Sequence, residues 1–197
     1  DVIRTTPLLS KLREEHVNAH ITWLTLSPDI LPANAIDTIY ALDAVSIFAL
    51  QNSIFDIVIN LDKDKEACLL MQLISADQKY GFTWEDEHVA ACTPAAEHKL
   101  MTGFFDQISK ENTKSYLEEI FEICHFDFRK EDYQINLNQT LAANWKDKLQ
   151  ALANGKTIVG LNTGCGPRWN TRLWSEESWE TLAKQLQENG YYPVFLG

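Results

Sequence analysis

Two glycines and two arginines near the C-terminal end of the chain could together bind a phosphate group. Gly164 and Gly166 follow the apolar run "TIVGLN" (157–162), and Arg168 and Arg172 come shortly after them. A glycine has no Cβ, so backbone N–H groups can approach an oxyanion closely, and a guanidinium can donate two hydrogen bonds to one phosphate. The segment therefore predicts an anion-binding loop. Its candidate ligand-binding residues are Asn162, Thr163, Gly164, Arg168 and Arg172.

An ordinary surface loop is an alternative interpretation of the same segment. Neither of two common phosphate-binding motifs, GxGxxG and GxxxxGK[ST], is present in the sequence. The neighbouring Trp174 and Trp179 are more typical of packing anchors than of a platform for a nucleotide base. Residue types and spacing alone therefore leave the function of this loop open.

The opening of the chain offers a second group that could do chemistry. Asp1 precedes a Thr-Thr-Pro sequence (residues 5–7), which is typical of a helix start with a hydroxyl cap. A carboxylate there would lie near a helix N-terminus and could accept a proton. A solvent-exposed capping acid is the simpler interpretation, because a helix dipole lowers the pKa of a nearby carboxyl and weakens it as a base.

Alternating strand-like and helix-like segments predict an α/β fold with mostly parallel sheets. In such sheets, ligands bind outside the carboxyl ends of the strands, where both candidate groups are expected. The predicted strands cover residues 20–25, 36–42, 55–61, 79–82, 157–162 and 191–197. The predicted helices begin near residues 5–7 and cover 64–74, 113–125, 141–152 and 176–189, the last with a left-handed cap at Gly190.

Two segments do not follow this alternation. Residues 83–112 show no clear period, and we interpret them as a surface excursion that contains a short helix at most. The polar stretch 127–140 is the predicted linker. It separates an N-terminal domain, 1–135, from a second domain, 136–197.

Composition argues against several classes of protein. A net charge of −11 disfavours nucleic-acid binding, which needs a basic face. No apolar run approaches the roughly 20 residues that span a bilayer. The four cysteines are widely spaced and the five histidines form no ligand pattern, so we predict free buried thiols and no metal site.

Several stretches resemble glycosyltransferase family 9, the lipopolysaccharide heptosyltransferases. "DVIRTTPLLSKLREEHVNAHITWLT" is similar to the N-terminal signature of the family, and "FDIVINLDKDKEA" resembles its mid-domain strand. "VGLNTGCGPRWNTRLWSEESWETLAKQL" resembles the opening of its second domain. The likeness extends over nearly the whole chain, with the two ends the most specific.

The resemblance implies a GT-B fold, in which two Rossmann-like domains face each other. It also implies an inverting transfer that needs no metal and no cofactor. ADP-heptose would be the donor, bound mainly by the second domain, and an inner-core sugar of lipopolysaccharide would be the acceptor, bound mainly by the first domain. A donor with another base or sugar stays open, because the base-recognising residues are expected beyond Gly197.

The resemblance also assigns roles to individual residues. Asp1 matches the general base, and Thr163 and Gly164 match residues that contact the donor phosphates. Arg172 matches the cation that neutralises charge on the departing diphosphate, and Arg168 is a second cation without a family match. On the acceptor side, Arg4 and Lys63 are expected to face carboxylates and phosphates.

The chain departs from the family pattern at three places. The first strand and the glycine before Asp1 are missing, and Ser175 stands where proline is usual. A later donor-binding loop of the family would lie beyond Gly197. We therefore expect the 197 residues to be truncated at both ends and inactive by themselves.

Further expectations follow from the same resemblance. The protein would be a cytoplasmic monomer that works on a lipid-linked glycan acceptor, with peripheral association at the inner membrane. Two alternatives remain at this point. One is a non-catalytic nucleotide-binding or regulatory module with the same fold, and the other is a GT-B enzyme that uses a different nucleotide-sugar.

Overall fold

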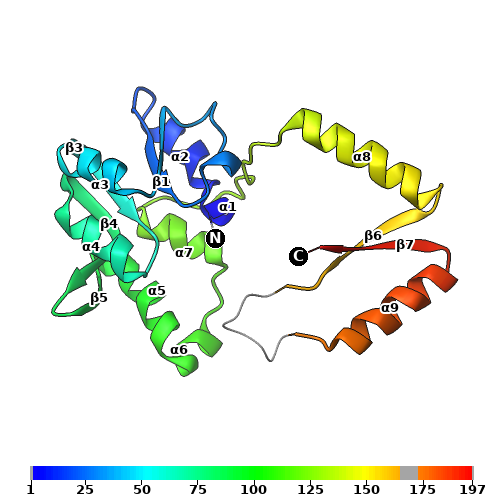
Figure 1. Ribbon diagram of the computed structural model, residues 1–197. Helices are drawn as coiled ribbons and strands as arrows, with labels where there is room; N and C mark the ends of the chain where they lie inside the picture. The colour runs from blue at the N-terminus through cyan, green and yellow to red at the C-terminus, as the bar shows by residue number, and fades with distance from the viewer. Residues whose placement is uncertain (1, 165–172, 197) are drawn as a thin grey trace. The chain divides into compact units, whose positions relative to one another are not determined.

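The computed structural model describes residues 2–164 and 173–196 and divides the chain into two compact units (Figure 1). Unit 1 is Asp1–Asn136 and unit 2 is Leu137–Gly197. The boundary predicted from the sequence lies one residue earlier. Asp1, Arg168 and Arg172 lie outside the described residues.

Unit 1 contains two small sheets. In the first, β1 (Thr22–Thr25) pairs in parallel with β2 (Thr38–Ala41). In the second, β3 (Ile54–Asn60) pairs in parallel with β4 (Ser75–Glu85), and β4 pairs antiparallel with β5 (His88–Ala91). Within the described residues, no ladder joins the two sheets.

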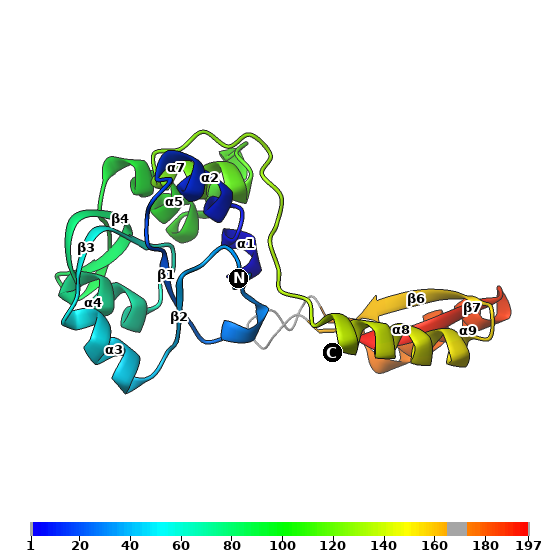
Figure 2. The same ribbon diagram turned by 90° about the horizontal axis from the view of Figure 1, so that it is seen from above.

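Helices cover both faces of these strands. They are α1 (Val2–Thr5), α2 (Leu8–Glu15), η1 (Pro28–Ile30), α3 (Ala44–Gln51), α4 (Lys65–Leu73), α5 (Pro94–Phe104), α6 (Asp106–Glu111) and α7 (Tyr116–Ile123). Figure 2 shows α2 and α7 on one side of the strands and α3 and α4 on the other. The fold is therefore α/β, as the alternation predicted.

Helix α2 contributes to two hydrophobic clusters, one against each sheet. On α2, Leu8 belongs to a cluster that packs against Ile59 of β3, whereas Leu9 belongs to one that packs against Trp23 of β1. Successive strand residues point to opposite faces. Val58, next to Ile59, accordingly packs against a third cluster, formed by Leu50 of α3, Leu70 of α4 and Ile74 directly after α4, and Leu24 of β1 packs against the same cluster. Unit 1 thus encloses both sheets between layers of helices.

The prediction for residues 83–112 was wrong. These residues complete β4, form β5, and continue into α5 and α6. The hairpin turns at Asp86 and Glu87, whose φ angles of 48° and 66° are both positive. Such a turn usually has Asn-Gly or another pair with glycine at these positions. The Asp-Glu pair therefore gave no turn signal in the sequence.

The predicted hydroxyl cap near residues 5–7 was also wrong. The hydroxyls of Thr5 and Thr6 donate to the carbonyls of Val2 and Ile3, and α2 has Pro7 at its cap without a side-chain bond. The Thr6 hydroxyl also accepts a hydrogen bond from the amide of Gln134. It therefore ties the start of unit 1 to the segment that leads out of it.

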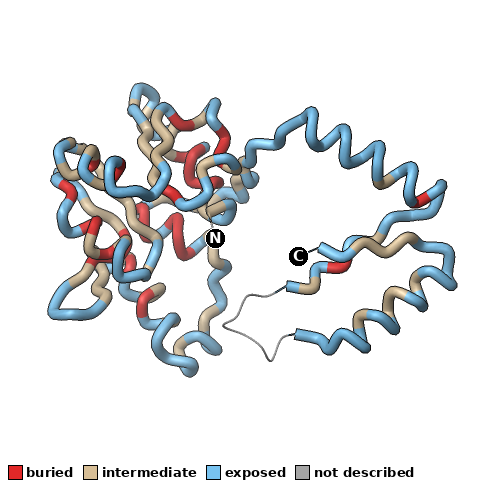
Figure 3. Tube along the Cα trace, viewed as in Figure 1, coloured by how far each residue is buried: buried red, intermediate tan, exposed pale blue. Residues whose placement is uncertain are grey.

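Unit 2 consists of α8 (Gln139–Ala153), β6 (Thr157–Asn162), α9 (Glu176–Glu188) and β7 (Tyr191–Leu196), and Figure 1 shows the two helices on opposite sides of the strands. β6 and β7 are parallel. Ser175 caps α9 through the amide of Ser178, and Gly190 follows the helix with a φ of +85°, as predicted. Figure 3 shows that buried residues concentrate in unit 1 and are sparse here.

The carboxylate of Asp37 gives one pH-dependent prediction for unit 1. It accepts hydrogen bonds from the Ile21 amide (2.7 Å) and the Arg13 guanidinium (2.6 Å), and these contacts lower its pKa. The Asp37 carboxyl therefore binds its proton more weakly in the folded state than in the unfolded state. The ionised carboxylate stabilises the fold fully above the ordinary pKa of 3.8, and this stabilisation is lost as the pH falls through the lowered pKa.

Asp37→Asn should therefore lower the melting temperature at pH 6, with a difference that disappears as the pH is lowered towards 2. Thermal unfolding followed by circular dichroism from pH 2 to 7 measures this difference. Asp56→Asn, at an exposed position of β3, controls for loss of a surface charge. A difference that stays constant across the pH range would show that the ionised carboxylate does not stabilise the fold.

Candidate active site

The glycine loop begins at the carboxyl end of β6. The amide and the hydroxyl of Thr163 both donate to the carbonyl of Leu196, each at 3.2 Å. These bonds tie the start of the loop to the end of β7. Among the residues that the structure describes, none would contact a Cβ added to Gly164 within 4 Å.

An open groove lies beside this loop, between α9 and β7. Its volume is about 500 Å³. Its lining residues are Thr163, Glu176, Trp179, Glu180, Ala183, Lys184, Gln187 and Phe195. The rings of Trp174 and Trp179 contact each other with centroids 5.0 Å apart, so the two tryptophans pack together near the start of α9. The predicted cations of the loop, Arg168 and Arg172, lie outside the described residues.

In unit 1, the two residues predicted on the acceptor side meet in one cluster. The guanidinium carbon of Arg4 lies 3.6 Å from the centre of the Tyr116 ring. Lys63 donates from Nζ to the carbonyl of Lys99 (2.8 Å), and Nζ of Lys99 itself lies 5.0 Å from the same ring. Arg4 of α1 and Lys99 of α5 therefore both lie over Tyr116 of α7, whereas Lys63 bonds to the backbone of Lys99 and has its Nζ 5.1 Å from the centre of the Phe82 ring.

The end of β3 that leads to Lys63 is held by a network of short-range contacts. The Asn60 amide group donates to the carbonyls of Asp62 (3.0 Å) and Phe82 (2.8 Å). Gly81 has a φ of +100°, and a Cβ at this position would overlap with the carbonyl of Asn60. Only glycine therefore allows β4 to approach the end of β3 so closely.

Lys63 is also accommodated by a glycine. A Cβ on Gly103 of α5 would overlap with Nζ of Lys63, so the absence of that Cβ makes room for the amine. Burial lowers the pKa of Lys63, and the nearby charge of Lys99 lowers it further. The ammonium is thus held partly out of water beside a second cation.

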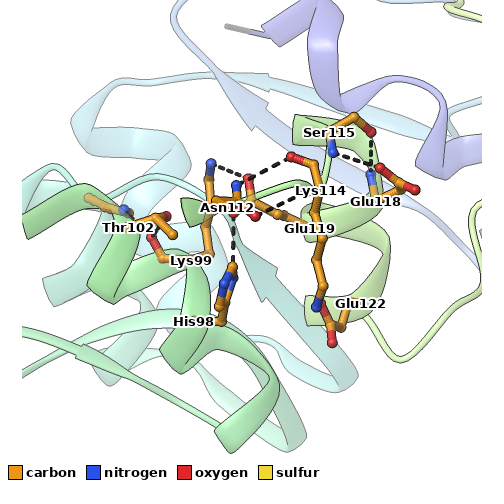
Figure 4. Close-up of polar contacts among 10 residues, drawn as sticks. His98, Lys99, Thr102, Asn112, Lys114, Ser115, Glu118, Glu119 and Glu122 are labelled. Carbon is orange, nitrogen blue, oxygen red and sulfur yellow. Dashed lines mark hydrogen bonds and ion pairs between the residues drawn. The ribbon is translucent and has the colours of Figure 1, made fainter. Parts of the chain in front are cut away.

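Glu119 is the buried carboxylate of this cluster, with a side chain only 3% exposed. Figure 4 shows Lys99, Asn112 and His98 converging on it. Its oxygens lie 2.6 Å from Nζ of Lys99, 3.2 Å from Nδ2 of Asn112 and 3.6 Å from Nδ1 of His98. The carboxylate therefore fixes Lys99 between α5 and α7.

Sequence reasoning missed both Lys99 and Glu119. Lys99 falls in the segment that was interpreted as a surface excursion. Glu119 lies within the predicted helix 113–125, three residues after Tyr116 and four before Ile123, on the edge of the apolar stripe. An acid at that position was an available signal for a buried ion pair.

The thiols of Cys68 and Cys124 are buried and unreactive at neutral pH. Cys68 and Cys124 are buried and Cys92 is half-buried, all as free thiols, whereas Cys165 lies outside the described residues. Burial raises the pKa of Cys68 to about 11 and that of Cys124 to about 12, so these thiols stay protonated at neutral pH. Across residues 2–164 and 173–196, no three metal-ligating side chains gather, and no helix is long and apolar enough to cross a bilayer.

Two α/β units, each with parallel strands and with candidate ligand-binding residues beyond their carboxyl ends, place the protein in the Rossmann-like class. The particular family follows from its sequence. Residues 47–197 match the model of glycosyltransferase family 9 (heptosyltransferase), and the chain belongs to this family.

A solved structure has a similar fold. It is the crystal structure of the glycosyl transferase family 9 from Veillonella parvula DSM 2008, which is 21% identical with a TM-score of 0.66. The match covers 100% of this chain but 58% of the Veillonella chain, so the present chain spans little more than half of that protein's length. A search of curated proteins found no match.

Proposed function

We propose that the protein transfers a sugar from a nucleotide-sugar donor to a glycan acceptor. The observation that carries this proposal is the family match, which extends from α3 through the glycine loop to the end of unit 2. The more specific form is transfer of a heptose from ADP-heptose to lipopolysaccharide core or a related surface glycan, with inversion and without a metal. The protein would act as a monomer at the cytoplasmic face of the inner membrane.

In the proposed reaction, each candidate group has one role. A hydroxyl of the acceptor attacks the anomeric carbon of the donor while Asp1 accepts the hydroxyl proton. The bond between the anomeric carbon and the diphosphate oxygen breaks, and the nucleoside diphosphate leaves. Arg172, with Arg168 and the backbone amides near Gly164, would stabilise the negative charge that develops on it.

The cluster around Tyr116 supports an anionic acceptor. Arg4 and Lys63 were each expected to face carboxylates or phosphates; Arg4 lies over the same ring as Lys99, and Lys63 donates to the Lys99 backbone. Partly buried cations attract an anion more strongly than exposed ones, because water screens them less. An inner-core sugar that carries phosphate or carboxylate groups would fit this surface of unit 1.

The proposal is tested by incubating the full-length protein with ADP-heptose and a deacylated core oligosaccharide, and by detecting the glycosylated product by mass spectrometry. We expect one added heptose per acceptor with equimolar release of ADP. Parallel titrations of ADP-heptose, with and without acceptor, separate transfer from binding. A protein that binds the donor but forms no product with any core acceptor would be a nucleotide-binding module.

A further inference from the structure

We propose that the outer side of α3 is a docking surface for a cationic amphipathic helix of a partner protein. This α3 surface consists of Val45 and Phe48 of the helix, Leu42 just before it, and Leu26, which follows β1. The inference goes beyond the proposed function, because it concerns a partner other than the donor and the acceptor.

The first argument is the composition of α3. Six of its eight residues are apolar, and a helix that is apolar on all sides is normally buried on all sides. Here Ser46 and Leu50 are only 6% and 5% exposed, whereas Val45 and Phe48 are 78% and 64% exposed. Figure 2 shows α3 on the outside of unit 1, next to α4. A serine therefore faces the core, while two large apolar side chains, three positions apart, are left uncovered by the described residues.

The second argument is that the apolar surface continues beyond the helix. The amide of Leu42 donates to the carbonyl of Thr25 at 2.9 Å, and Thr25 pairs with Ala41 in the parallel register. Leu26 therefore lies beside Leu42, and these two side chains are 80% and 39% exposed. Single apolar residues are normal on a protein surface, whereas a contiguous apolar patch marks a site of interaction.

The third argument is the charge around this surface. Residues 14–62 contain seven acids and no lysine or arginine. Two of these acids adjoin the α3 surface and are exposed: Asp43 caps α3, and Asp29 follows Leu26 in η1. A segment that carries lysine or arginine beside its apolar side chains would complement both the leucines and phenylalanine and the carboxylates.

Other occupants of the α3 surface match these observations less well. A second copy of the chain in a two-fold dimer would bring the same carboxylates towards each other. A membrane with anionic lipids would be repelled by them. An amphipathic helix presents apolar anchors three and four positions apart, which is the spacing that Val45 and Phe48 offer in return.

The test uses the full-length protein and a fluorescein-labelled peptide of about 18 residues, which forms a helix with leucine on one face and lysine on the other. We expect saturable one-to-one binding, measured by fluorescence anisotropy, and no binding of a peptide with glutamate in place of lysine. Phe48→Ser and Val45→Ser should each weaken binding of the lysine peptide by at least about tenfold, because each removes an apolar anchor.

Two further variants make the comparison specific. Phe104→Ser removes a phenylalanine that is 60% exposed at the end of α5, and it should bind the lysine peptide as the wild type does. Asp43→Asn keeps a good helix cap but removes one charge. It should weaken binding of the lysine peptide several-fold, with a larger effect at low salt than at high salt.

Maleimide labelling of Phe48→Cys in the full-length protein tests whether the surface is free. We expect one more labelled thiol than in the wild type. The inference is overturned if no additional thiol is labelled, because another part of the protein then covers α3. It is also overturned if Phe48→Ser binds the lysine peptide as tightly as the wild type.

Two further results would assign the α3 surface to another occupant and so overturn the inference. One is a dimer of the wild type that Phe48→Ser dissociates in analytical ultracentrifugation. The other is binding to vesicles of phosphatidylcholine and phosphatidylglycerol that the same variant loses. None of these measurements contains a sugar donor, so the inference and the proposed function can fail separately.

Discussion

Asp1→Asn should lower the rate of sugar transfer by about 10²–10⁴-fold, which is the usual contribution of a general base. The asparagine has nearly the same shape but cannot accept the proton of the attacking hydroxyl. Donor affinity should change by less than about twofold, because the expected phosphate contacts lie in the loop after β6 and not at Asp1. Release of nucleoside diphosphate measures the rate, and calorimetric titration of the donor measures the affinity.

A matched control for this substitution is Asp77→Asn, which removes one carboxylate from an exposed position of β4. It should transfer sugar at the wild-type rate. Unchanged turnover in Asp1→Asn would exclude Asp1 as the base. Loss of donor affinity together with turnover would instead assign Asp1 to donor binding.

Gly81→Ala should destabilise unit 1 by at least about 3 kcal/mol, because it combines two separate costs. The added Cβ overlaps with the carbonyl of Asn60, and the φ of +100° is strained for any residue with a side chain. The backbone must shift at the end of β3, immediately before Lys63. Urea unfolding at neutral pH, followed by circular dichroism, measures the change in the free energy of unfolding.

Gly155→Ala isolates the backbone part of this cost. Gly155 also has a positive φ, +81°, but an added Cβ there meets no atom within 4 Å. Its substitution should cost only about 1–2 kcal/mol. Equal losses in the two variants would mean that the close approach of β4 to Asn60 contributes nothing to the stability of unit 1.

Apolar runs predicted most of the fold correctly. The segments 20–25, 36–42 and 55–61 are β1, β2 and β3, and the stripe in 113–125 is α7. Hydrophobic periodicity is a strong signal where one side of an element is buried. The turn at residues 86–87 was missed because its positive φ angles are carried by acids, and α3 was missed because it is apolar on all sides and shows almost no period.

The candidate site was only partly predictable for a different reason. Arg4 and Lys63 were identified separately, and no sequence pattern relates two residues that far apart in the chain. Their link through Lys99 and Tyr116 depends on how α1, α5 and α7 pack, which local propensity does not determine. Lys99 and Glu119 form their ion pair across that same packing, so they appear as partners only in the folded unit.

The central proposal is that the full-length family 9 protein transfers a sugar without a metal ion, with protein cations in its place. Its most direct test is the release of nucleoside diphosphate by the full-length protein, with ADP-heptose and a core acceptor, in excess EDTA. We predict that release matches the glycosylated acceptor one to one, is unchanged by EDTA, and falls sharply in Arg172→Met. Donor binding without any release, or release that EDTA abolishes, would contradict the claim.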